Sequence, residues 1–216
     1  MNIIWKGQSC FQITTQKAKI QINIIIDPFK EETGLRVSSM TADIVLITHN
    51  HPDHNNVKAV SGEPFVASGP GEYDVKDIYI QGISSWHDNV HGKELGENTI
   101  YIIDVEGLRL CHLGDIGQKE LTDDQLEKIG SVDVLFVPVG GNSTISAKEA
   151  LNIMSQIEPE TTIPMHYQIP KLKYKLDGVE KFLKSLGIKS ISPEAKLSIK
   201  KKDLSTDEAK IVVLKP

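Results

Sequence analysis

Short apolar runs separated by turn-forming residues fill the first half of the chain, a pattern typical of β-strands. The segment ADIVLIT at 42–48 is apolar at both odd and even positions, which predicts a strand buried on two faces. A turn at Glu106-Gly107 between two apolar runs predicts a hairpin. The predicted strands of this half are 2–6, 10–15, 18–27, 42–48, 78–86, 99–105 and 108–113.

Helices alternate with strands in the second half. LTDDQLEKIG at 121–130 and SAKEALNIMSQIEP at 146–159 both open with a capping box, formed by Thr122 with Gln125 and by Ser146 with Glu149. LDGVEKFLKSLG at 176–187 is amphipathic and predicts a third helix that ends at Gly187. The predicted strands of this half are 132–139, 161–167 and 209–215.

This order of elements predicts an α/β fold in which two packed sheets carry helices on the outside. No linker-like change of composition interrupts it, so we expect a single domain over 1–216. The alternative, one doubly wound sheet, is disfavoured by the early hairpins. No GxGxxG or Walker-type loop is present. SGPGEYD at 68–74 has the wrong glycine spacing to bind phosphate and predicts a turn.

Composition narrows the class of protein. The 216 residues are 39% apolar and 25% charged, and no apolar run approaches the ~20 residues that span a bilayer. The first residues lack the features of a secretory signal, so we expect a cytoplasmic protein without a membrane anchor. Cys10 and Cys111 lie in apolar, strand-like surroundings, which predicts free buried thiols rather than a disulfide.

Charge is distributed unevenly along the chain. Residues 166–216 hold 12 lysines and 6 acidic residues, which gives this segment a charge of +6. Because the net charge of the chain is −5, residues 1–165 carry a charge of −11. One interpretation is a basic region that attracts anionic substrates or nucleic acid. The other is a set of solvated surface lysines. The second is favoured, because the lysines lack interleaved aromatic residues and a nucleic-acid-binding motif.

The stretch ITHNHPDHNN at 47–56 directly follows one of the predicted buried strands and has the pattern HxHxDH. Imidazole nitrogens and carboxylate oxygens are the usual ligands of zinc-like ions. If the backbone stays extended, His49 and His51 project to the same side and can hold one ion. Asp53 and His54 then begin a turn and point elsewhere, which suits a second ion. The spacing favours two metals over one, and a solvated polar loop is the weaker alternative.

Further ligand candidates lie at the ends of other predicted strands. His87 and His166 each end a strand, and Asp88 could orient the neighbouring imidazole. Asp115 lies between Gly114 and Gly117, which let the chain turn close to a ligand.

Two other histidines are ambiguous. On an extended strand His112 points away from the face of Asp115, so it is expected to pack behind the site or to donate a hydrogen bond to it. His91 lies in a polar loop, where solvent exposure and a role with substrate are equally open.

The chain resembles the metallo-β-lactamase superfamily of hydrolases, in particular its small single-domain bacterial and archaeal members. The resemblance runs nearly end to end through WKGQSCFQI, IIIDPF, THNHPDH, SSWHD, CHLGDIG, FVPVGG and IPMHY. It implies a four-layer αβ/βα sandwich with two mixed sheets, outer helices and metals at the sheet edges. It also implies that His49, His51 and His87 hold one metal, that Asp53, His54 and His166 hold a second, and that Asp115 bridges both.

Two adjacent cations imply a dinuclear metal-dependent hydrolase. A bridging hydroxide, formed at a pKa of about 7, would attack a small ester, lactone or phosphoester. Asp53 would orient this nucleophile, and His91 and Tyr167 are candidates for the leaving-group acid. Zinc is the expected metal, with manganese or iron as alternatives, and the expected substrate is a small, anionic molecule. The alternative functions are a nuclease or phosphodiesterase that acts on nucleic acid, and a metal-binding regulatory protein without turnover.

Overall fold

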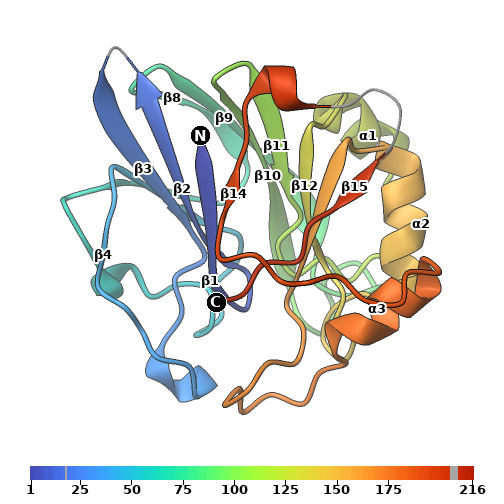
Figure 1. The fold of residues 1–216 in the computed structure, drawn as a ribbon. Helices are drawn as coiled ribbons and strands as arrows, with labels where there is room; N and C mark the ends of the chain where they lie inside the picture. Colours follow the sequence, from blue (N-terminus) through green and yellow to red (C-terminus); the bar gives the residue numbers. More distant parts are fainter. Residues whose placement is uncertain (18, 205–208) are drawn as a thin grey trace.

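The computed structural model describes residues 1–17, 19–204 and 209–216. Two mixed β-sheets face each other across a common core, and α-helices cover the outer face of one of them (Figure 1). The first sheet has the strand order β14-β1-β2-β3-β5-β7 and the second β15-β13-β12-β11-β10-β9-β8. A small sheet pairs β4 with β6. The expected α/β fold with two mixed sheets is confirmed.

The first sheet and the small sheet are built mainly from the N-terminal third of the chain. Antiparallel pairing joins β1, β2 and β3, whereas β3, β5 and β7 run parallel. The bounds are β1 (Asn2–Gly7), β2 (Cys10–Lys17), β3 (Ile20–Ile26), β4 (Met40–Thr41), β5 (Ile44–Ile47), β6 (Val60–Ser61), β7 (Phe65–Ser68) and β14 (Leu197–Ser198).

The second sheet also combines both kinds of pairing. Strands β8 to β11 are antiparallel, and β11, β12, β13 and β15 are parallel. The bounds are β8 (Gly71–Val75), β9 (Ile78–Trp86), β10 (Glu97–Val105), β11 (Leu108–His112), β12 (Val134–Pro138), β13 (Thr161–Met165) and β15 (Lys210–Ile211).

The helices are α1 (Asp123–Ile129), α2 (Ala147–Ile157) and α3 (Val179–Ser185), and they lie along the outer side of the second sheet (Figure 1). Both predicted capping boxes are present at the starts of α1 and α2. Helix α3 is shorter than predicted because its first residues belong to a preceding loop, where Asp177 donates its backbone N–H to the Gly140 carbonyl. The short helical turns are η1 (Glu31–Thr33), η2 (Val57–Ala59) and η3 (Lys201–Asp203).

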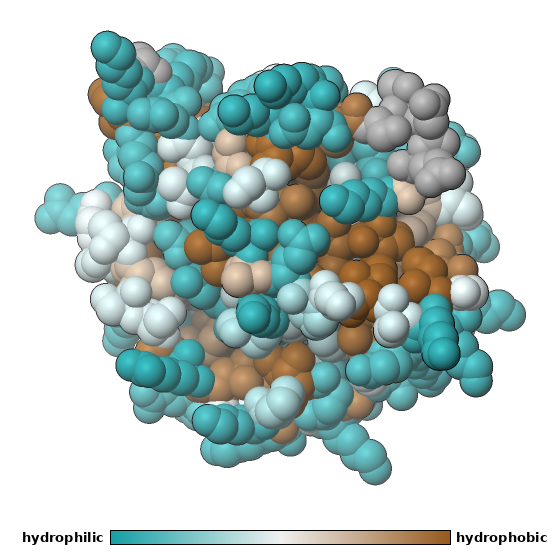
Figure 2. Space-filling model, in the orientation of Figure 1, coloured by the Kyte–Doolittle hydropathy of each residue, from teal (hydrophilic) through white to brown (hydrophobic). Residues whose placement is uncertain are grey.

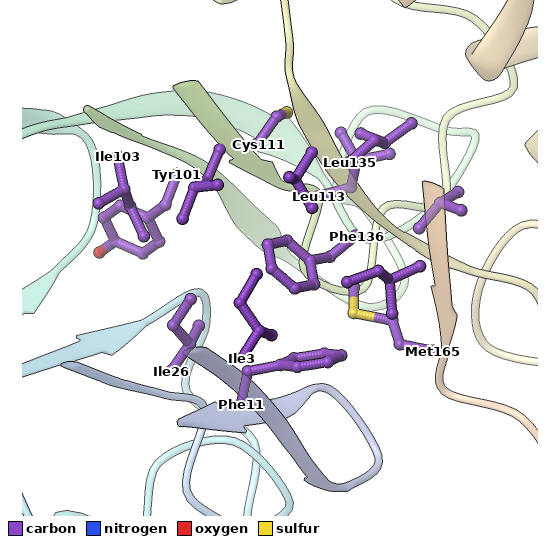
Figure 3. Packing of buried hydrophobic residues seen from close by; sticks show 14 of the residues in the cluster. Ile3, Phe11, Ile26, Tyr101, Ile103, Cys111, Leu113, Leu135, Phe136 and Met165 are labelled. Carbon is purple, nitrogen blue, oxygen red and sulfur yellow. The ribbon is translucent and has the colours of Figure 1, made fainter. Parts of the chain in front are cut away.

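The facing sheets bury large apolar side chains between them. Phe11 of β2 packs against Phe136 of β12 with ring centroids 4.5 Å apart, and Ile3 and Tyr101 are also fully buried in this core (Figure 3). Burial of such side chains stabilises the fold by roughly 1.5–3 kcal/mol each. Because the two sheets share this core, the loops at one end of both sheets are held in fixed relation to each other.

Strand β5 is buried on both faces, as its sequence predicts. Ile44 and Leu46 face the core between the sheets, while Val45 and Ile47 belong to a second apolar cluster with Met40 of the small sheet. The layer that covers Val45 and Ile47 lies on the outer face of the first sheet. Within the described residues, it contains 3₁₀ turns and the β4–β6 pair rather than α-helices. The strand that precedes the histidine cluster is therefore packed against apolar side chains on both faces.

Three expectations need correction or qualification. SGPGEYD is wrong as a turn beyond Gly69-Pro70, because 71–75 form β8, which pairs with β9 and packs Tyr73 against the core. The sequence pattern did not predict the short strands β4, β6, β7 and β14, and the predicted strand at 209–215 is confined to Lys210–Ile211. Ala18, the first residue of the third predicted strand, lies outside the described residues, and the strand begins at Ile20.

Two predictions about cysteine and membranes can be compared with the structure. Cys10 and Cys111 are free and buried, as expected, and burial raises the pKa of both thiols. None of the described helices combines the length and apolar character needed to cross a bilayer. Figure 2 shows that polar side chains cover most of one face of the molecule, with a larger apolar area between β15 and α3.

Candidate metal centre

The loop after β5 and the end of β9 bring three histidines together at the end of the sheets. His49, His51 and His87 each offer a ring nitrogen, and the three atoms lie within 4.8 Å of one another. The ring centroids of His49 and His51 are 4.6 Å apart, and those of His49 and His87 are also 4.6 Å apart. His87 follows the last residue of β9. Two residues of the HxHxDH pattern thus meet a histidine from the opposite sheet.

A second group forms beside the first, on the other side of a backbone turn. His54 donates its backbone N–H to the His51 carbonyl at 3.0 Å, which redirects the chain as predicted. Asp53 and His54 then meet His166, which follows β13, with ligand atoms again within 4.8 Å of one another. The decapeptide therefore contributes to two adjacent groups of donors.

Asp115 lies between the two groups. Its Oδ2 is 3.2 Å from His54 Nε2, 3.1 Å from His166 Nε2 and 3.7 Å from His87 Nε2. Its other carboxylate oxygen accepts a hydrogen bond from Ser9 Oγ at 2.9 Å. A buried carboxylate with three imidazole nitrogens around one oxygen is suited to bridge two cations.

A buried carboxylate behind the cluster sets the orientation of two rings. Asp27 accepts hydrogen bonds from the Thr48 backbone N–H at 2.8 Å, the Thr48 hydroxyl at 2.7 Å and His54 Nδ1 at 2.9 Å. Since the Thr48 hydroxyl donates to Asp27, it accepts from His49 Nδ1, 2.9 Å away. Both rings therefore carry a proton on Nδ1 and turn Nε2 toward the centre, the orientation in which a histidine binds metal through Nε2.

The donor atoms fit divalent cations. Within the described part of the chain, the buried Nε2 atoms of His49 and His54 have no hydrogen-bond partner. Buried polar atoms are almost always satisfied, so two such atoms beside a carboxylate form a donor set that suits a cation. Nitrogen and oxygen donors in this number are those that zinc, manganese and iron bind.

Burial and mutual charge shift the pKa values of these groups. Burial, and then the charge of His54, lowers the pKa of His49, and burial lowers those of His51 and His166. For Asp115, burial raises the pKa, but the surrounding histidines outweigh it and hold the pKa well below its usual range. His54 shifts the other way: burial lowers its pKa, but the charges of Asp115 and Asp27 outweigh burial and raise the pKa well above its ordinary value. A bound cation would take the place of this positive charge beside the two carboxylates, since metal binding releases protons from its ligands.

The turn between β1 and β2 reaches into the same centre, which the sequence reasoning missed. Gln8 Nε2 donates to Asp53 Oδ2 at 3.3 Å and lies 3.5 Å from His166 Nε2. Gln8 is fully buried, and its Oε1 has no partner among the described residues. Gln8, Asp27 and His166 all have left-handed backbones, with φ of 51°, 47° and 50°. The motifs WKGQSCFQI and IIIDPF had marked Gln8 and Asp27 without assigning them a role.

Two glycines allow the ligand-bearing chains to cross closely. A Cβ at Gly117 would lie 2.2 Å from the His87 carbonyl oxygen, and a Cβ at Gly140 would lie 2.1 Å from the His166 carbonyl oxygen. Any side chain at either position would displace the backbone of a histidine in the cluster.

His112 and Asp88 lie behind the centre rather than in it. His112 is fully buried between Phe11 and Phe136, and its Nε2 donates to the Ser9 carbonyl at 2.9 Å. This is the packing position expected from its parity. Asp88 does not orient an imidazole: both of its carboxylate oxygens accept backbone N–H groups of the loop that follows it.

Neither candidate for the leaving-group acid lies at the cavity beside the cluster. His91 is exposed and lines a different depression, next to Trp86. Tyr167 is buried, and its hydroxyl donates to the Leu214 carbonyl at 3.2 Å. These positions do not support the expected proton-donor role for either residue.

A cavity of about 390 Å³ opens at the cluster. Besides cluster residues, it is lined by Pro52, Leu95, Asn142, Ser143, Tyr174, Lys175 and Leu176. Its volume falls in the range of small-molecule sites.

Comparison with known proteins agrees with this geometry. The model of the beta-lactamase superfamily domain matches residues 2–166. A UPF0173 metal-dependent hydrolase of Pyrococcus abyssi is 28% identical over 97% of this chain and 94% of its own length. A second UPF0173 protein of Pyrococcus abyssi is 32% identical over 77% of this chain and 83% of its own length.

A solved structure extends the likeness to the whole chain. A Thermotoga maritima protein, provisionally assigned as a Zn-dependent hydrolase of the metallo-beta-lactamase superfamily, is 34% identical with a TM-score of 0.76. The match covers 99% of this chain and 97% of that one. The chain therefore belongs to the metallo-β-lactamase superfamily and is a metal-dependent hydrolase.

Proposed function

We propose that the centre binds two divalent ions. His49, His51 and His87 would hold the first ion, Asp53, His54 and His166 the second, and Asp115 would bridge them. The observation that carries this proposal is the meeting of two three-residue donor groups beside one buried carboxylate. Zinc is the expected metal on the nitrogen-rich donor set, and the carboxylates of the second group also suit manganese or iron.

The proposed reaction is hydrolysis of a small ester, lactone or phosphoester. Ions bound here would supply a water with a pKa near 7 and polarise the bond to be cleaved. Asp53 orients the attacking water, and Gln8 Nε2 holds the Asp53 carboxylate in place. Asp27 and Thr48 fix the rings of His54 and His49. Because ligands come from both sheets, which share one core, residues 1–216 would act as a single domain.

Elemental analysis of the purified protein, followed by metal reconstitution and a hydrolase screen, tests this function. We expect two metal equivalents, and turnover of an ester, lactone or phosphoester that disappears with a chelator. Turnover that persists in the apoprotein, or the absence of turnover with two metals bound, would contradict it.

Two histidine variants test the ligand assignment. His87→Ala is expected to lose metal. His112→Ala is expected to keep both equivalents, because its ring contacts core residues, the Ser9 carbonyl and the Gly114 N–H and belongs to neither donor group. Loss of metal from the His112 variant alone would overturn the assignment.

A further inference from the structure

Two loops contribute to the wall of the cavity, and each begins within two residues of a histidine of the cluster. The loop at 88–96 follows His87 and contributes Leu95. The loop at 168–177 comes after His166 and Tyr167 and contributes Tyr174, Lys175 and Leu176. A substrate bound in this cavity would therefore lie beside side chains of both loops.

A single carboxylate organises the first loop. Asp88 Oδ1 accepts the backbone N–H groups of Val90 and Gly92 at 2.9 and 2.8 Å, and Oδ2 accepts those of Glu94 and Leu95 at 2.9 and 2.8 Å. Burial raises the pKa of Asp88, but these four donors together lower it well below its usual range. The loop thereby presents Leu95, a large apolar side chain that is 38% exposed, at the cavity.

A single amide organises the second loop. The loop ends are joined by the backbone hydrogen bond from Gln168 to the Asp177 carbonyl at 2.9 Å. The Gln168 side chain accepts the Leu176 N–H at 3.1 Å and donates to the Ile169 carbonyl at 3.1 Å. Lys173 also donates its backbone N–H to the Thr33 carbonyl. A short loop with joined ends and internal bonds is preorganised, which reduces the entropy lost on binding.

The second loop alternates in character along its length. Leu172 is buried and Tyr174 and Leu176 are half-buried, whereas Lys173 and Lys175 are exposed. Lys175 lines the cavity, and no carboxylate of the described residues lies within 4.0 Å of its ammonium. Burial and the neighbouring charge of Asp53 raise the pKa of Tyr174, so its hydroxyl remains a neutral donor. The wall thus combines a cation without a partner, a hydroxyl and apolar surface.

We propose that the two loops select a small substrate with a carboxylate or phosphate group and a short apolar segment. Lys175 would bind the charged group at the rim, and Leu95 and Leu176 would contact the apolar segment. The identity of the reaction rests on the proposed function, but recognition of the charged end depends only on the loops. Lys173, on the same loop but absent from the cavity lining, provides a matched control.

Binding of simple carboxylates to the zinc-loaded protein tests the proposal without any turnover. Calorimetry would compare succinate, glutarate and adipate with butyrate, valerate and hexanoate, the monocarboxylates of equal chain length. Both members of a pair have one carboxylate for the metal centre, and only the dicarboxylate has a second for Lys175. We expect at least one dicarboxylate to bind about fivefold more tightly than its monocarboxylate, the scale of a partly exposed ion pair.

Variants separate the charge from the loop as a whole. Lys175→Met should abolish the dicarboxylate advantage, Lys175→Arg should retain it, and Lys173→Met should leave it unchanged. Leu95→Ala should weaken hexanoate more than butyrate. Equal affinity for both members of every pair in the wild type, or equal losses in the two Met variants, would overturn the proposal. A failed hydrolase screen with these binding differences intact would instead count against the proposed reaction.

Discussion

The two ends of the sheet sandwich each carry a cavity lined by charged residues, and they differ in how those charges are paired. At the end opposite the metal centre, a larger cavity of about 620 Å³ lies among the β2–β3, β8–β9 and β10–β11 turns. Its four acidic residues all have cationic partners. These pairs are Asp77 with Lys17, Asp104 with Arg109, Glu106 with the Met1 ammonium, and Asp133 with Lys201.

The end with the metal centre has the smaller cavity, and its carboxylates have no lysine or arginine partners among the described residues. Asp115 and Asp53 are surrounded by imidazoles, and buried ring nitrogens lack partners among the described residues. Size alone would point to the wrong end. Convergent donors that the protein itself does not satisfy mark the functional end, because burying such groups without a ligand is unfavourable.

The largest effect expected from this comparison comes from replacing a buried carboxylate at each end. Asp27→Asn removes an acceptor that fixes the His54 ring, and loss of such partners typically lowers metal affinity about 10- to 100-fold. Asp133→Asn is the matched control, since Asp133 is also buried and accepts a backbone N–H, from Arg109. Competition with a chromogenic chelator measures both affinities. Equal losses in the two variants would break the comparison.

A smaller effect is expected at the opposite end. Lys201→Met removes the ion pair with Asp133 at 2.7 Å, but Lys201 is 58% exposed, so the unfolding free energy should fall by only about 0.2–1 kcal/mol. Urea unfolding measures this change. Metal content should stay the same, because the two ends are far enough apart to behave independently. A loss of metal would show that the ends are coupled.

The smallest expected effect is the contribution of Glu106, at the end opposite the metal centre, to the pH dependence of the unfolding free energy. Burial raises the pKa of Glu106, but hydrogen bonds from the Met1 ammonium, Thr15 and the Gln16 backbone lower it overall. A lowered pKa stabilises the fold above the ordinary value of 4.5 and loses that contribution as pH falls through the folded value. The unfolding free energy of the wild type should exceed that of Glu106→Gln by less than about 1 kcal/mol at pH 7, and the difference should shrink as pH falls below 4.5. A difference that grows toward acid pH would contradict this sign.

Much of the fold follows from local patterns in the sequence. The two capping boxes begin helices because the side chains of Gln125 and Glu149 reach back to the cap residues. The strand before the histidine cluster has apolar residues at both parities because both of its faces are covered. Strand β8 begins with a glycine and is exposed at alternate positions, so its apolar pattern was too weak to predict a strand.

The candidate centre was predictable only where chemistry was concentrated in the sequence. The HxHxDH spacing locates four donors and suggests two ions, and the family resemblance supplies the partners. Gln8 and Ser9 could not be found, because an amide and a hydroxyl are common residue types and reach the centre only through the pairing of β1 with β2. Asp88 was misread because its partners are backbone groups, which no residue type reveals.

The left-handed backbones of Gln8, Asp27 and His166 have an evolutionary consequence. Each non-glycine residue in this conformation costs roughly 1 kcal/mol or more, a cost that glycine would remove. A lineage that no longer needed the centre would gain stability by admitting glycine at these positions. Descendants that keep a glutamine, an aspartate and a histidine there should be those in which selection still maintains hydrolysis.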